Sequence, residues 1–172
     1  MKRSTRSVHD ALDRKMGADG AADGRAYADF LAVQYSARLP LEDWIAGNCP
    51  PDLEPPAQSP LIADDLSALG RDLPPPVPLA PLDGADWRGI AWALGGSSLG
   101  NRAMLVRRRK LAASGPDRFL SDPAMPRYFR RLLPILERPV PSSQEEAAVA
   151  AALRVFDAFE TALKNQAARL AA

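Results

Sequence analysis

The chain of 172 residues contains one cysteine, one histidine and few aromatic residues, which make up 6% of the sequence. A single cysteine, Cys49, cannot form an intramolecular disulfide and is typical of a protein from a reducing compartment. Its position between Asn48 and Pro50 predicts a half-buried thiol in a loop rather than a nucleophile. Because the histidine and the cysteine lie far apart in the sequence, a structural zinc site is not expected.

Neither sign of charge dominates, since 22 basic and 21 acidic residues give a net charge of +1. This balance gives no support for nucleic acid or an anionic membrane as a partner, and the scarcity of aromatic residues argues against base stacking. No apolar run approaches the roughly 18 residues of a membrane span. No apolar segment follows the basic residues 1–6, as it would in a secretory signal. We expect a cytoplasmic protein.

Alanine and leucine dominate the sequence, β-branched residues are sparse, and no segment alternates apolar and polar residues for long. The fold class predicted is therefore all-α, in one domain over residues 1–172, as a bundle of about six to eight helices. Pro40 is expected to end the second helix, and the proline-rich segment 73–81 to form an extended connector. The expected helices cover residues 5–16, 23–37, 60–69, 86–113, 123–137 and 142–171, and a short further turn is expected over 41–46.

His9, the only histidine, lies on the first expected helix, one residue after Val8 and three before Leu12. A histidine beside an apolar face is more often a satisfied structural residue than a ligand. A neutral imidazole is nevertheless a competent ligand for iron. The position of His9 alone leaves both interpretations open.

A second unusual feature is the segment from Gly95 to Gly100, which places three glycines inside an expected helix. Each glycine in a helix costs about 1 kcal/mol relative to alanine. Gly96 and Gly100, four residues apart, remove the side chains from one face, so that a neighbouring helix or a flat ligand can approach the backbone. No strand precedes the segment and no lysine occupies a phosphate-binding position, which excludes a Walker-type loop.

Four blocks of sequence together resemble the heme oxygenase family, and in particular its short bacterial branch. They occur in the family's order and span nearly the whole chain. The first is similar to the opening helix that carries the proximal histidine, the second to the next helix, the third to the distal helix and the fourth to the final helix. The blocks are RSTRSVHDALD at 3–13, YADFL at 27–31, LGGSSLG at 94–100 and FDAFE at 156–160.

The resemblance implies that heme b, which is both cofactor and substrate, lies between two helices with His9 as the ligand to its iron. Gly95, Gly96 and Gly100 would let the distal helix approach the porphyrin, and Gly96, Ser97 and Gly100 would form the catalytic surroundings. The co-substrate is O2, and the electrons come from a ferredoxin or a flavin reductase. The products that the resemblance implies are biliverdin, carbon monoxide and ferrous iron, and a bilin-accepting photoreceptor is an expected downstream partner.

Basic side chains are expected to pair with the heme propionates. The candidates are Lys2, two helical turns before His9, and Arg127, Arg130 and Arg131 on a later helix. For each arginine the alternative is a solvated helix face. The basic run 107–110 near a helix end is expected to be structural or to dock an acidic electron donor.

The chain departs from the family's distal helix at three positions. Gly95 replaces a glutamate, Asn101 replaces a second glycine, and Ser97 occupies the position of an acidic residue that organises distal water in the animal enzymes. These changes favour an alternative, a non-catalytic heme- or tetrapyrrole-binding protein of the same fold for storage or sensing. A third interpretation is a helical interaction protein without a cofactor, in which the glycines only pack helices.

Overall fold

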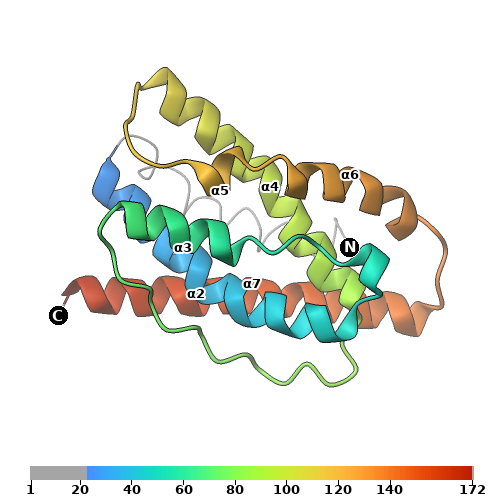
Figure 1. Ribbon diagram of the computed structural model, residues 1–172. Coiled ribbons are helices and arrows are strands. Elements are labelled where there is room, and N and C mark those ends of the chain that lie inside the picture. The colour runs from blue at the N-terminus through green and yellow to red at the C-terminus, as the bar shows by residue number, and fades with distance from the viewer. Residues whose placement is uncertain (1–22, 172) are drawn as a thin grey trace.

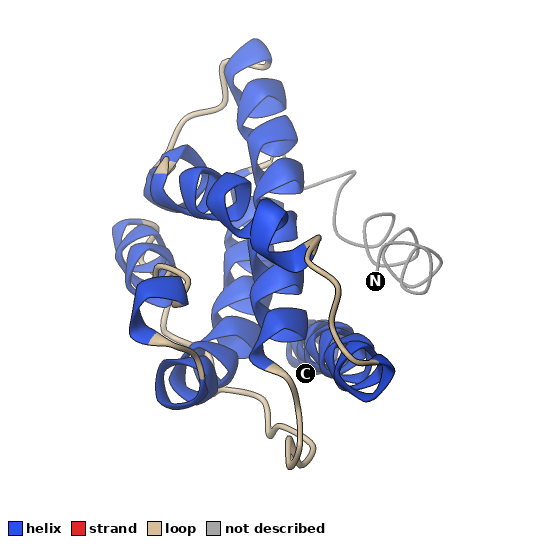
Figure 2. Ribbon diagram, turned by 90° about the vertical axis from the view of Figure 1, so that its right-hand side faces the viewer, coloured by secondary structure: helices blue, strands red, loops and turns tan. Residues whose placement is uncertain are grey.

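The computed structural model describes residues 23–171, and within this range it contains six α-helices, one 3-10 helix and no strand (Figures 1 and 2). The all-α prediction is therefore confirmed. The helix expected over 5–16 lies outside the described residues. The elements are α2 (Gly24–Asn48), η1 (Pro51–Leu53), α3 (Ser59–Ala68), α4 (Trp87–Lys110), α5 (Arg118–Ser121), α6 (Ala124–Leu136) and α7 (Ser142–Ala171).

Helix α7 runs along the molecule and packs against both α2 and α4, while α3 packs on α2 and α6 on α4 (Figure 1). The larger apolar core joins α4, α6, α7 and the second half of α2, and a smaller core joins the first half of α2 to α3 and α5. None of the helices in residues 23–171 has the length and the hydropathy that crossing a bilayer requires.

The expected break at Pro40 is wrong, because α2 continues through this residue to Asn48. Proline has no N–H, so the carbonyl of Ser36 loses its normal donor four residues later. That carbonyl instead accepts a hydrogen bond from the N–H of Val77, at 3.0 Å. The Ser36 hydroxyl donates to the carbonyl of Pro75 at 2.7 Å. The expected extended connector thus crosses α2 and satisfies the group that Pro40 leaves free.

The other expected helices agree with the structure to within three residues at each end. Gly70 follows α3 with a positive φ of 64°, as expected for a residue that ends a helix. Asp86 caps the start of α4 by accepting from the N–H of Arg88 at 2.8 Å. The short helix α5 was not predicted, because four residues are too few to show a helical period.

One close approach between helices involves Gly89, a glycine that the sequence does not mark as unusual. A Cβ atom at this position would collide with the carbonyl oxygen of Ala148 and lie 2.9 Å from the backbone nitrogen of Ala152. Ala148, Ala151 and Ala152 are all buried. Helices α4 and α7 therefore pack backbone against backbone at this point, which only glycine on one side and alanine on the other permit.

We predict that Gly89→Ala lowers the free energy of unfolding by about 1–3 kcal/mol, because the added methyl group forces α4 away from α7. The matched control is Gly47→Ala on α2, where a Cβ would meet no described atom within 4 Å. This substitution should leave stability unchanged or raise it by up to about 1 kcal/mol. Urea denaturation followed by circular dichroism measures both. Equal stability of the two variants would contradict the proposed contact.

Candidate functional site

The glycine-rich segment of α4 has an open side that carries Gly96 and Gly100. A Cβ at Gly100 would meet no described atom within 4 Å, and one at Gly96 would meet only Cζ of Phe129, at 3.6 Å. Leu99, beside them, is 66% exposed. The described residues therefore present a side of α4 on which the backbone is accessible beside an exposed apolar side chain. A flat apolar partner can lie directly against such a surface.

Gly95 lies on a different side of the helix. A Cβ there would be 2.6 Å from Cδ2 of Phe129, a buried residue of α6. This glycine therefore admits the aromatic ring of a neighbouring helix. A neighbouring helix, α6, explains why position 95 is a glycine. No described residue packs against Gly100, so the second explanation, the approach of a flat ligand, stays open for that position.

Two serine hydroxyls bond back to the same helix. The Ser97 Oγ donates to the carbonyl of Leu94 at 2.7 Å, and the Ser98 Oγ donates to the carbonyl of Gly95 at 2.6 Å. Ser97 also accepts a hydrogen bond of 2.5 Å from a guanidinium nitrogen of Arg38 on α2. Its proton and one of its lone pairs are therefore committed, and one lone pair remains to accept a further hydrogen bond.

Arg38 is fully buried, which is unusual for a charged residue. Its Nε donates to Oε1 of Gln34 at 2.9 Å, and its guanidinium lies 5.3 Å from the ring centroid of Phe119 and 5.9 Å from that of Phe159. Burial lowers the pKa of Arg38 to about 10, an effect that the nearby carboxylate of Glu42 opposes. At neutral pH the side chain therefore remains a cation.

Glu42 gives Arg38 only partial compensation. The closest approach is 4.0 Å, between Nη1 of Arg38 and Oε1 of Glu42. The carboxylate accepts shorter bonds from the backbone N–H groups of Gln58 and Ser59 and from the Ser59 hydroxyl, at 2.9, 3.0 and 2.6 Å. Nη1 of Arg38 finds no hydrogen-bond partner among residues 23–171. A buried cationic donor next to Ser97 thus retains the capacity to bind one more acceptor.

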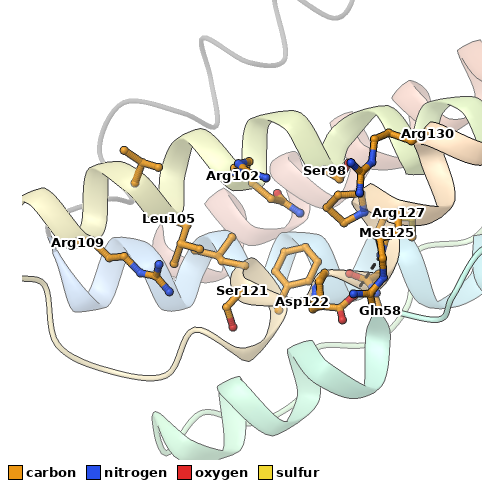
Figure 3. Close-up of a pocket in the computed structure, with 16 residues that line it drawn as sticks. Gln58, Ser98, Arg102, Leu105, Arg109, Ser121, Asp122, Met125, Arg127 and Arg130 are labelled. Atoms are coloured by element: carbon orange, nitrogen blue, oxygen red, sulfur yellow. Dashed lines mark hydrogen bonds between the residues drawn. The ribbon is translucent and has the colours of Figure 1, made fainter.

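The structure brings Arg127 and Arg130 together in a pocket between α4 and the α5–α6 segment (Figure 3). Arg131 is exposed and does not line this pocket. Gly96 and Gly100 do not line it either. The two arginines therefore lie near Ser98, on a different side of α4 from the open glycines. His9 and Lys2, the remaining predicted site residues, lie outside the described residues.

The basic run at the end of α4 divides into two parts. Arg107, Arg109 and Lys110 are exposed and form a basic patch. Arg108 is 3% exposed and lies 3.7 Å from the ring centroid of Tyr27, and its Nη2 donates to the carbonyl of Ser114 at 2.9 Å. Its role is therefore structural.

Cys49 ends α2 and is buried. Burial raises the pKa of its thiol from the ordinary 9.0 to about 11, an effect to which the charges of Glu54 and Asp52 add. A nucleophilic cysteine has its pKa lowered instead. Over residues 23–171, no cluster of histidine, cysteine and acidic side chains is suited to hold a metal ion.

Comparison with known proteins gives the class of fold. No family model matches the sequence, and no curated protein matches it. Among solved structures, a chain from the crystal structures of the NO- and CO-bound heme oxygenase from Neisseria meningitidis matches with a TM-score of 0.74 and 21% sequence identity. The match covers 96% of the present chain and 88% of that chain. The protein therefore has the heme oxygenase fold.

We predict that Arg38→Met lowers the free energy of unfolding by about 3 kcal/mol, because it leaves the buried Glu42 and Ser97 without their cationic partner. Arg71→Met is the control, since Arg71 pairs with Asp29 at 3.1 Å but has a side chain that is 40% exposed. Arg71→Met should lower the free energy of unfolding by less than about 1 kcal/mol. Thermal and urea unfolding measure the difference, and a neutral Arg38→Met would mean that the buried charge is dispensable.

We also predict that alkylation of Cys49 by iodoacetamide at pH 8 is at least about 100-fold slower in the folded chain than in urea. The shift of its pKa from 9.0 to about 11 lowers the thiolate fraction by about that factor, and burial limits access further. Mass spectrometry of timed samples measures the rate. A comparable rate in both states would show that the thiol is accessible.

Proposed function

We propose that the protein is a heme oxygenase that cleaves heme to biliverdin, carbon monoxide and ferrous iron with O2 and external electrons. The observation that carries the proposal is the open side of α4 at Gly96 and Gly100, on a chain with the heme oxygenase fold. The sequence blocks around His9 and around Gly96 independently resemble the two helices between which that family holds heme.

The described residues fit a flat, largely apolar macrocycle. Gly100 offers bare backbone, Gly96 is obstructed only by the edge of Phe129, and Leu99 adds apolar contact. In this proposal heme b would lie against this side of α4, and the imidazole of His9 would hold its iron. Gly95 contributes indirectly, because it admits Phe129 and so fixes α6 against α4.

Bound heme would supply the iron centre at which O2 is activated and would itself be the substrate. The chain's part is to orient the porphyrin, to exclude bulk water and to place polar groups beside the open side of α4. Arg38 holds the Ser97 hydroxyl so that its proton points to the carbonyl of Leu94 and its free lone pair can accept from a distal water. The nearby positive charge favours any negative charge that develops there.

The surrounding basic residues complete the proposal. Lys2 and Arg131 remain the predicted partners of the heme propionates, whereas Arg127 and Arg130 line a pocket on a different side of α4 from the open glycines. The exposed patch of Arg107, Arg109 and Lys110 is the proposed docking surface for an acidic electron donor, a ferredoxin or a flavin reductase. A bilin-accepting photoreceptor remains a proposed recipient of the product.

A second candidate function is heme or tetrapyrrole binding without turnover. Ser97 favours it, because this residue carries no charge and its only proton is already donated to Leu94. Gly95 favours it as well, because Phe129 occupies the space beside this position, where the family has a glutamate. Such a site would retain heme but lack a carboxylate for organising water.

The test is to mix the full chain with hemin, add an electron donor in air and record the visible spectrum over time. We expect a Soret band that forms and then decays into the broad red absorption of biliverdin. A Soret band that is stable to reductant and oxygen would support the binding function instead. The absence of a Soret band would contradict both functions.

We predict that Gly100→Leu weakens hemin binding by at least about tenfold, because the new side chain projects from the open side of α4. The control is Gly47→Leu, which adds the same side chain to α2 at a position with equally free surroundings. This control should bind hemin as the unsubstituted chain does, and circular dichroism should show both variants folded. His9→Ala should lose the spectrum of a histidine-ligated heme. Unchanged binding by Gly100→Leu would place heme elsewhere.

A further inference from the structure

The pocket between α4 and the α5–α6 segment has a volume of about 370 Å³. This is near the lower end of the range for small-molecule sites, roughly 300–1,000 Å³. Three buried apolar side chains, Phe119, Leu120 and Met125, line its interior. Arginines line it from both sides, with Arg102 and Arg109 on α4 and Arg127 and Arg130 on α6 (Figure 3).

This pocket is separate from the proposed heme surface. On α4 it is lined by residues that recur at helical spacing, among them Ser98, Arg102, Leu105 and Arg109. Gly100 is two residues from both Ser98 and Arg102, and two residues correspond to about 200° around a helix. The pocket and the open glycines therefore lie on nearly opposite sides of α4.

The pocket concentrates positive charge in a chain whose net charge is only +1. Its one acidic lining residue is Asp122. The carboxylate of Asp122 accepts from the N–H groups of Ala124 and Met125 at 3.1 and 3.3 Å and from Nε2 of Gln58 at 3.0 Å. Asp122 is thus engaged at the start of α6 and forms no ion pair with a pocket arginine within the described part of the chain.

Three of the four pocket arginines lack a carboxylate partner among residues 23–171: Arg102, Arg127 and Arg130. Arg109 alone has one, Asp117, at 3.7 Å in an exposed pair. Some arginines elsewhere form closer pairs, such as Arg71 with Asp29 at 3.1 Å, and other exposed arginines, such as Arg107, also have no carboxylate partner within residues 23–171. All four pocket arginines are exposed, so water screens their mutual repulsion. Their concentration around one pocket with an apolar interior is what favours an anionic ligand there.

We propose that this pocket binds a small organic dianion, a short apolar skeleton that carries two carboxylate or phosphate groups. The guanidinium fork matches both groups. Arginines from α4 would hold one anionic group and arginines from α6 the other, while the skeleton lies over Phe119 and Met125. The apolar interior selects an organic ligand over inorganic phosphate, and the two basic walls select two charges over one.

The experiment is calorimetric titration of the full chain at fixed ionic strength with adipate, hexanoate and inorganic phosphate. Adipate should bind at least about tenfold more tightly than hexanoate, which has the same number of carbons and one charge. It should also bind more tightly than phosphate. Equal affinities for adipate and hexanoate, or tighter binding of phosphate, would overturn the proposal.

Variants locate the site and separate it from heme binding. Arg102→Gln and Arg127→Gln should each weaken adipate binding by at least about fivefold. Their controls are Arg107→Gln and Arg131→Gln, which replace exposed arginines of the same two helices that do not line the pocket. The control variants should change the affinity for adipate by less than about twofold. Equal losses of adipate affinity in all four variants would indicate only general electrostatic attraction and would overturn the proposal. A loss of hemin affinity in Arg127→Gln without any loss of adipate affinity would return this residue to the propionates and overturn the proposal.

Discussion

A fully buried cation, Arg38, links most of the helices of the described fold. The guanidinium of Arg38, on α2, bonds to Ser97 of α4 and lies against the rings of Phe119 in α5 and Phe159 in α7. Its neighbour Glu42 accepts bonds from the start of α3. A fully buried charge is costly unless its partners stay in place. The positions of five helices, and of the glycine-rich segment in particular, are therefore mutually constrained.

Much of the fold could be predicted from local sequence, because most of its signals lie within single helices. The helices expected over 60–69, 86–113, 123–137 and 142–171 agree closely with α3, α4, α6 and α7. Pro40 could not be interpreted locally. Whether a proline breaks a helix depends on whether the freed carbonyl finds another donor, and here that donor is Val77, far along the chain.

The site was only partly predictable for a similar reason. A run of glycines shows that something approaches a helix, but only the packing shows that Phe129 meets Gly95 and that no described residue covers Gly100. Arg38 was not predicted as a residue of the site, because arginine side chains are ordinarily exposed to solvent. A usable signal was present, since Gln34, Arg38 and Glu42 recur every four residues along α2 and therefore share one face.

The hydrogen bond between Ser36 and Val77 has a consequence for how this fold can vary. The Ser36 carbonyl can serve the proline-rich connector because Pro40 offers it no N–H. Any other residue at position 40 would supply a competing donor within the same helix, and the connector would keep only the hydrogen bond between the Ser36 hydroxyl and Pro75 as an undisputed link to α2. Position 40 and the segment around Val77 are therefore expected to change together among related sequences. A relative without this proline would need other contacts to hold the connector as firmly against α2.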